Sequence, residues 1–152
     1  MSGPEERTHV SESAPFRWEG IPVLAYKEEG SHFRDISRQV LFEDESLGAE
    51  LRYFEIAPGG WSSLERHHHM HAVMIVRGEG RALVGDRIVD LKPHDLVRVP
   101  PLTWHQFRAG PNDSLGFLCL VACNRDRPER PDEEAVKGLR ANREVGEFVR
   151  MG

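Results

Sequence analysis

The sequence predicts an all-β protein, a sandwich or barrel with one short helix near its C-terminal end. Between residues 21 and 122, short runs with strand-like composition alternate with turn signals made of Gly, Pro, Asn and Asp. Many short strands at such close, regular spacing are typical of a sandwich or barrel. An apolar stripe with helical spacing follows residue 131, where the helix is expected.

The composition is that of one globular domain. The chain has 152 residues, 39% hydrophobic and 30% charged, with a formal net charge of −5, and this length can bury a sizeable core. The negative charge argues against a large basic surface for nucleic acid. No apolar run reaches the ~20 residues of a membrane span. Residues 1–15 lack a signal-peptide core, and Cys119 and Cys123 are expected to be free thiols, so we expect a cytoplasmic protein.

Three segments are expected along the chain. Residues 1–16 are rich in Ser, Glu, Pro and Thr, and are predicted to be a disordered N-terminal arm. Residues 17–123 hold all the predicted strands and form the barrel. Residues 124–152 form a linker and the helix, which begins near Asp132 because acidic residues at a helix start suit its dipole.

The first half of the barrel is expected to contain five strands, at residues 21–26, 36–42, 49–57, 63–67 and 71–77. The first is an edge strand, because Pro22 cannot donate a backbone hydrogen bond. Pro58-Gly59-Gly60 has turn chemistry and is expected to end the third. A tight turn joins the last two.

The second half is expected to contain five more strands, at residues 81–84, 87–91, 95–99, 104–109 and 115–122. Gly78-Glu79-Gly80 and Gly85-Asp86 read as hairpin turns before and after the first of these strands. Pro100-Pro101 begins a rigid turn into the fourth.

A cluster of ligand-type residues dominates the middle of the chain. Four of the eight histidines lie within five residues, 67–71. On a strand, residues i and i+2 share a face, so Glu65 and His67 can point together into a barrel. His71 can return to the same place after a turn, and His105 can join them from a later strand.

Three imidazoles and one carboxylate suit one divalent transition metal per chain: Fe, Mn, Ni, Cu or Zn rather than Ca or Mg. His69 has the parity of His67 and is an alternative ligand if the turn falls elsewhere. Glu65 has a second reading, as a partner that orients His67 from outside the metal.

The spacing of these residues resembles the first motif of the cupin superfamily. That motif runs glycine, five residues, His-x-His, three or four residues, Glu, six residues, glycine. Here Gly59, five residues, Glu65-x-His67, three residues, His71, six residues and Gly78 reproduce every interval. Glu65 replaces the first histidine of the pattern and His71 replaces its glutamate.

The second cupin motif runs glycine, five residues, Pro-x-Gly, two residues, His, three residues, Asn. Here Pro100 and His105 fit, while His94, Leu102 and Ala109 stand where the motif has its glycines and asparagine. The resemblance covers about residues 48–122. It implies a cupin jelly-roll barrel with a bound metal, and a homodimer.

Candidates for the wall of a substrate pocket follow from parity with the ligands. Val73 and Ile75 share the parity of His71, and Phe107 shares that of His105; core packing is the equal alternative for all three. Tyr53 is a fourth candidate, although parity does not decide whether Tyr53 or Arg52 points inward.

The leading functional hypothesis is a metal-dependent enzyme that acts on a small organic molecule. The three-His, one-Glu set most resembles the cupin dioxygenases, with Glu65 as a possible general base. Two alternatives stay open: an isomerase or lyase that uses the metal as a Lewis acid, and a binding protein without turnover. No nucleic-acid or membrane partner is expected.

Overall fold

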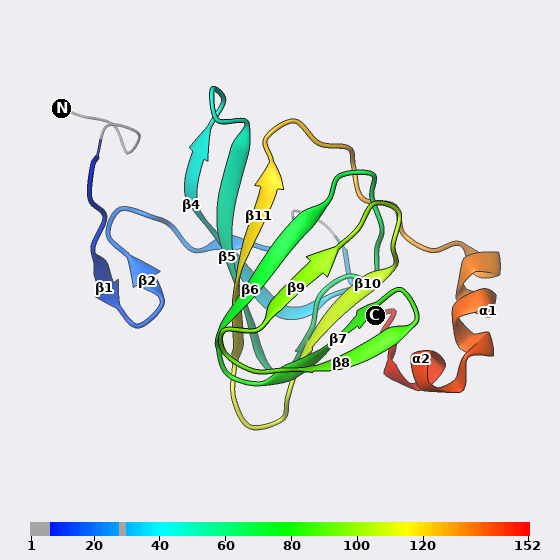
Figure 1. Ribbon diagram of the computed structural model, residues 1–152. Coiled ribbons are helices and arrows are strands. Elements are labelled where there is room, and N and C mark those ends of the chain that lie inside the picture. The colour runs from blue at the N-terminus through cyan, green and yellow to red at the C-terminus, as the bar shows by residue number, and fades with distance from the viewer. Residues whose placement is uncertain (1–6, 28–29) are drawn as a thin grey trace.

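The computed structural model describes residues 7–27 and 30–152, and it confirms the predicted all-β fold (Figure 1). The strands are β1 (Glu12–Ala14), β2 (Arg17–Trp18), β3 (Leu24–Ala25), β4 (Arg34–Asp44), β5 (Ala49–Trp61), β6 (His71–Arg77), β7 (Gly80–Val84), β8 (Arg87–Leu91), β9 (Leu96–Val99), β10 (His105–Ala109) and β11 (Leu115–Ala122). Two helices follow, α1 (Glu133–Ala141) and α2 (Arg143–Phe148).

Strands β3 to β11 form one antiparallel sheet that curls into a barrel. Along the sheet the order is β8-β7-β10-β5-β11-β6-β9, with β4 beside β5 and β3 beside β4. The long strand β5 joins the two halves: Ala49 to Ile56 pair with β11, and Trp61 pairs with Arg108 of β10. The two halves enclose the main core, which includes Phe54, Ile56, Val73, Ile75, Phe107 and Phe117.

The structure resolves the parity of β5. Arg52, Phe54 and Ile56 face the interior, and the last two belong to the core. Tyr53 faces outward, yet it is fully buried because the N-terminal arm covers it. Its ring stacks on Phe16 with centroids 5.4 Å apart and meets Trp18 edge-on at 5.3 Å.

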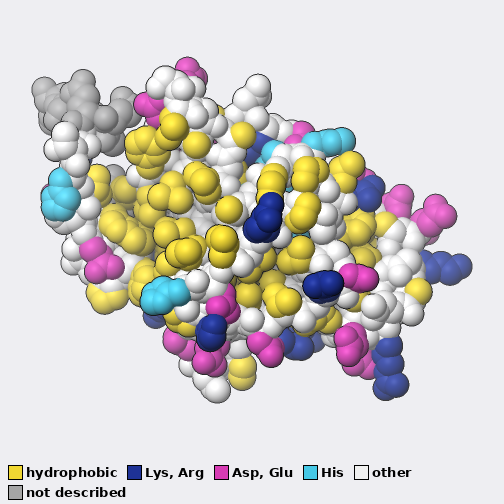
Figure 2. Space-filling view, in the orientation of Figure 1, with side chains coloured by type: hydrophobic (Ala, Val, Ile, Leu, Met, Phe, Trp, Pro, Cys, Tyr) yellow, Lys and Arg dark blue, Asp and Glu magenta, His cyan; other side chains and the backbone are white. Residues whose placement is uncertain are grey.

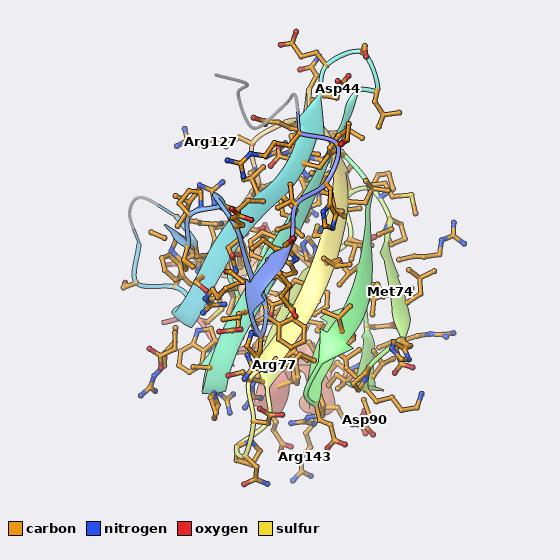
Figure 3. All side chains as sticks on the ribbon, turned by 90° about the vertical axis from the view of Figure 1, so that its left-hand side faces the viewer. Asp44, Met74, Arg77, Asp90, Arg127 and Arg143 are labelled. Atoms are coloured by element: carbon orange, nitrogen blue, oxygen red, sulfur yellow. The ribbon has the colours of Figure 1, made fainter. Side chains whose placement is uncertain are left out.

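The arm is an ordered hairpin of β1 and β2, which Figure 3 shows crossing in front of β5 and β11. Arg17 of this hairpin and Arg77 of β6 both bind the Glu55 carboxylate, which also accepts a hydrogen bond from the Tyr53 hydroxyl. The prediction of disorder therefore fails at residues 12–14, where strand pairing and aromatic burial hold the chain. Residues 1–6 of the predicted arm lie outside the described residues.

Two predicted strand boundaries are wrong. Strand β5 continues through Pro58-Gly59-Gly60 to Trp61, because Gly59 takes a positive φ of 78° and lets the strand bend instead of ending. Residues 63–67 form no full strand; Glu65 and Arg66 make only isolated bridges, to His105 and Glu129.

The C-terminal region contains two helices instead of the single one predicted. Asn142 lies between them, and its side chain accepts a hydrogen bond from the Val145 backbone, which caps α2. Val145 and Phe148 of α2 are buried against Leu64 and Leu83 in a second core beside the barrel. No helix in the described part of the chain has the length and apolar character to cross a membrane.

Both positions at which the second cupin motif has glycine take left-handed backbone conformations here. His94 has φ of 77° and Leu102 has φ of 53°, a region that costs a residue with a Cβ about 1–2 kcal/mol.

We expect Leu102→Gly to raise the free energy of unfolding by about 0.5–1 kcal/mol, after the greater chain entropy of unfolded glycine is subtracted. Urea unfolding measures this. The control is Val89→Gly, at an exposed position of β8 with negative φ, which should lower the free energy of unfolding. A lower free energy of unfolding in both variants would contradict backbone strain at Leu102.

Candidate metal centre

Three histidines from separate parts of the chain meet inside the barrel. His71 begins β6, His105 begins β10, and His67 lies in the loop before β6. One ligand atom from each lies within 4.8 Å of the other two. All three side chains are at least nine-tenths buried, so the group is shielded from bulk water.

The backbone around the loop fixes these positions. His105 and Glu65 exchange two backbone hydrogen bonds, of 3.0 and 3.2 Å, which brings the loop against β10. The Leu102 backbone donates to the His67 carbonyl at 2.7 Å. The proline turn and the histidine loop therefore hold each other in register.

Each of the three rings has its Nδ1 engaged by a neighbour. The partners of His67, His71 and His105 are the His69 carbonyl at 2.6 Å, the Cys119 thiol at 3.0 Å and the Thr103 carbonyl at 2.9 Å. A carbonyl only accepts, so Nδ1 of His67 and His105 carries the proton and Nε2 keeps its lone pair. Such outer partners are what orient a metal-ligating imidazole.

The Nε2 atom of His71 is in a position that a bound metal would explain. This atom is buried and has no hydrogen-bond partner among the described residues. An unsatisfied buried nitrogen is costly. A divalent ion bound to the three Nε2 atoms would satisfy it, so the donor set fits a metal of the borderline class.

The electrostatic state of the rings also suits metal binding. Burial, followed by repulsion from His105, lowers the pKa of His67 from 6.5 to about 4 and that of His71 to about 2. Burial likewise lowers the pKa of His105. The three imidazoles are therefore neutral at pH 7, which is the form that binds a metal.

Glu65 stands beside this group but has another partner. Its carboxylate forms an ion pair of 2.5 Å with Lys27 and lies outside the set of three converging ligand atoms. Both side chains line the same pocket as the histidines. Glu65 is therefore placed to act on a bound molecule, and its role as a fourth metal ligand stays a prediction.

His69 also lines the pocket without joining the three ligand atoms. Its ring lies parallel to that of His67, with centroids 3.7 Å apart, and its Nδ1 is 2.8 Å from Asp126. Asp126 also accepts hydrogen bonds from the backbones of His68 and His69, and these bonds lower its pKa. This arrangement ties the histidine loop to the segment that follows the barrel.

The pocket has a volume of about 210 Å³ and is open at one side of the metal group. Phe107, Phe54 and Phe117 line the pocket from the core cluster of the barrel. The other three predicted wall residues lie elsewhere: Val73 and Ile75 are in the core, and Tyr53 is under the N-terminal arm. Parity alone could not separate these positions.

Several polar residues of the pocket come from segments outside the two motifs; for Arg38 the sequence allowed either contact with a substrate carboxylate or a surface role. They are Lys27 and Arg38 before the first motif, and Arg125 after the last strand. Residues 124–131, predicted as a simple linker, cross the pocket as a strap: Glu129 pairs with Arg66 in backbone and side chain, and Pro128 lines the cavity. Figure 3 shows Arg127 of this strap pointing away from the barrel.

Comparisons with known proteins agree with this geometry. A family model described as a cupin domain matches residues 52–121. The chain is 52% identical over 135 residues to a Rhodospirillum rubrum protein named 1-methylthio-D-xylulose 5-phosphate methylsulfurylase, and the match covers 88% of this chain and 86% of that protein.

Solved structures show the same relationship. A cupin 2 conserved barrel domain protein from Rhodopseudomonas palustris has a TM-score of 0.90 and 49% identity, over 95% of this chain and 100% of that one. A cupin-2 domain from Rhodospirillum rubrum has a TM-score of 0.84 and 49% identity, over 92% and 94%. With the barrel, the two motifs and relatives that match along almost the whole length, this chain belongs to the cupin superfamily.

Proposed function

We propose that this chain is a metal-dependent cupin enzyme that acts on the methylthio group of 1-methylthio-D-xylulose 5-phosphate or of a closely similar ketose phosphate. The observation that carries the metal is the convergence of three neutral imidazoles with oriented Nδ1 atoms. The substrate class is supported by the name of the relative that is 52% identical across most of both chains.

The chemistry of such a substrate matches the pocket. The molecule has a ketone next to the carbon that carries sulfur, and a phosphoryl group at its other end. A divalent metal held by His67, His71 and His105 would supply Lewis-acid polarisation of a carbonyl oxygen. The aromatic wall of Phe54, Phe107 and Phe117 would exclude water from the reacting carbon.

Glu65 is the proposed proton carrier of the reaction. Its carboxylate lines the pocket, and the bridge between Glu65 and His105 holds it beside a metal ligand. Lys27 fixes the orientation of the carboxylate through their ion pair. A carboxylate in this position can hand a proton to, or take one from, the carbon next to the ketone.

Dioxygenase chemistry, which the sequence predicts, would use the same three histidines and Glu65 for a different reaction, and it stays a prediction. It requires O₂ as a substrate, whereas action at a methylthio group does not. Oxygen consumption therefore separates the two hypotheses.

The test is an assay of the full chain, stripped of metal and reloaded separately with Mn²⁺, Fe²⁺, Ni²⁺, Cu²⁺ or Zn²⁺. 1-Methylthio-D-xylulose 5-phosphate is added with and without a small thiol as sulfur acceptor, while an oxygen electrode records O₂. We expect metal-dependent cleavage of the bond between C1 and sulfur without O₂ uptake: the methylthio group forms a disulfide with the added thiol, and a proton takes its place on C1. Uptake of O₂ in proportion to product would favour the dioxygenase, and no turnover with any metal would favour a binding protein.

We also propose a homodimer in which the outer face of β11, β6 and β9 packs against a second copy. Leu120, Met74 and Leu96 lie on this face and are 40–59% exposed, and β-pairing places their strands side by side. Figure 2 shows the hydrophobic side chains gathered across this side, and Figure 3 shows Met74 on the outer side of β6. An apolar sheet face of this kind favours association.

Sedimentation analysis of the wild type and of Met74→Asp tests the dimer. The wild type is expected to sediment with twice the mass of the chain and the variant as a folded monomer. A monomeric wild type at micromolar concentration would refute the proposal.

A further inference from the structure

We infer that Arg38 and Arg52 form an anion subsite at the pocket wall that binds the phosphoryl group of the substrate. This inference deepens the proposed function and rests on it for the identity of the substrate. Its physical basis is separate, because it comes from two half-buried arginines of the pocket wall and not from the three histidines.

The two arginines are neighbours on adjacent strands. Arg38 of β4 lies opposite Phe54, and Arg52 of β5 lies opposite Val40, so the two side chains are diagonal neighbours on the inner face. Both line the cavity that contains the three histidines. Their guanidinium groups therefore reach the space in which a bound molecule would lie.

Arg38 has unused hydrogen-bonding capacity. Its Nε is buried without a hydrogen-bond partner, and within the described ranges 7–27 and 30–152 its guanidinium makes no ion pair. Arg52 donates from one Nη to the Cys119 thiol at 3.4 Å and its Nε is also without a hydrogen bond, 3.8 Å from Glu50. A buried donor without a partner, such as the Nε atom of each arginine, is costly unless a ligand accepts its hydrogen bond.

The charge balance of the pocket indicates how much negative charge the ligand brings. Four cationic side chains line it: Lys27, Arg38, Arg52 and Arg125. Two carboxylates pair with them: Glu65 binds Lys27, while Glu50 serves both Arg52 and Arg125. The described residues thus leave an excess of two positive charges, with Arg38 as the cation that has no carboxylate.

A phosphoryl group is the ligand that these features fit. Near neutral pH it carries between one and two negative charges and three acceptor oxygens, and paired guanidinium groups are suited to bind it with several hydrogen bonds. A carboxylate brings one charge and two oxygens, which leaves the excess only half balanced. Binding at this wall would also orient the substrate, with the phosphoryl group at the arginines and the ketone toward the histidines.

The first test measures anion binding without turnover. The metal-loaded full chain is titrated calorimetrically with inorganic phosphate, and in a separate arm with acetate. Wild type and Arg87→Gln, a control at an exposed position of β8, should bind phosphate equally. Arg38→Gln should weaken phosphate binding about 10–100-fold, as expected for lost charge-assisted hydrogen bonds. Phosphate bound only to the metal would be unaffected by Arg38→Gln, and that result would overturn the inference.

Thermal unfolding provides a second readout. Phosphate should raise the melting temperature of the wild type but not that of Arg38→Gln. Without phosphate, Arg38→Gln should melt at or above the wild-type temperature, because it removes a half-buried cation whose Nε has no partner among the described residues. A large loss of stability in the variant would show that Arg38 is a structural residue and would contradict the inference. Acetate binding as tight as phosphate, and equally sensitive to Arg38→Gln, would assign a carboxylate in place of the phosphoryl group.

Steady-state kinetics separates this inference from the proposed function. On 1-methylthio-D-xylulose 5-phosphate, Arg38→Gln should raise KM about 10–100-fold with little change in kcat, and the two proteins should act alike on the unphosphorylated ketose. If the wild type turns over the substrate and Arg38→Gln has the same KM, the anion subsite is refuted and the proposed function still holds. If phosphate binding depends on Arg38 but the wild type does not turn over the substrate, the proposed function is refuted and the anion subsite still holds.

Discussion

His71→Ala and His105→Ala are each expected to lose the bound metal and to reduce metal-dependent activity at least about 100-fold. The three imidazoles come from three places in the fold, and each has its own Nδ1 partner, so the loss of one ring removes one of three oriented ligand atoms. Even the loss of an outer partner of a ligand commonly costs 10–100-fold in affinity or activity. Elemental analysis of protein purified without a histidine tag measures the metal content.

His68→Ala is the matched control. It changes the neighbouring histidine, whose side chain is exposed, while its backbone keeps the bond to Asp126. Metal content and activity should equal those of the wild type. Circular dichroism should show that all three variants keep the barrel. Full metal retention in both His71→Ala and His105→Ala would refute the assignment of these histidines as metal ligands.

The metal-free protein is expected to lose stability steeply as the pH falls below about 6.5. In the folded state the pKa of His67 is about 4 and that of His71 about 2, and the pKa of His105 is also lowered, whereas an unfolded histidine titrates near 6.5. Between these values the unfolded chain binds more protons than the folded one. The stability is therefore fully present above pH 6.5 and is lost on acidification, by up to about 1.4 kcal/mol per pH unit for each histidine.

Urea unfolding of chelator-treated protein at pH 7.5, 6.0 and 5.0 measures this loss. For His67 the loss should end near pH 4, where the folded state also takes up the proton, while His71 continues to contribute at lower pH. His71→Ala should show a shallower dependence, because it removes one of the three titrating groups. Equal stability at pH 7.5 and 5.0 in the wild type would show that the rings are not buried neutral imidazoles.

The metal-group histidines could be found from the sequence because their geometry follows from local rules. The fixed intervals of the two motifs, as the cupin resemblance reads them, place His67, His71 and His105 near one another, whereas strand alternation does not account for His67, which lies in a loop. The order and type of the strands followed from turn residues and β-propensity in the same way. These are short-range signals that a single sequence carries.

The remaining features depend on contacts between distant parts of the chain. Lys27 lies 38 residues before its partner Glu65, and Asp126 lies 57 residues after His69, so no local pattern joins them. Tyr53 was placed in the pocket because parity defines two faces of a strand without saying which one is inside. Its burial on the outer face depends on Phe16, the last residue of the segment predicted to be disordered, and on Trp18 two residues later.

The strand end predicted at Pro58-Gly59-Gly60 is also wrong because of contacts with distant strands. Pro58-Gly59-Gly60 has the residues of a turn, but the chain only bends there, and β5 resumes its pairing at Trp61 with Arg34 of β4 and Arg108 of β10. Gly60 is needed there because a Cβ at this position would lie 2.5 Å from the Arg34 carbonyl oxygen. In this case glycine permits close strand packing and a bend rather than a reversal of the chain.

The strap of residues 124–131 has a consequence for how relatives of this chain should be sorted. The segment that matches the cupin model, residues 52–121, contains the three converging histidines. Lys27, Arg38, Arg125 and Pro128, which shape the cavity around them, all lie outside it. The matched segment thus supplies the three histidines and the aromatic wall, while three of the four cationic side chains of the pocket, Lys27, Arg38 and Arg125, come from the flanking segments. Cupins that share these flanks should share a substrate even where their barrels diverge, and cupins with similar barrels but different flanks should not.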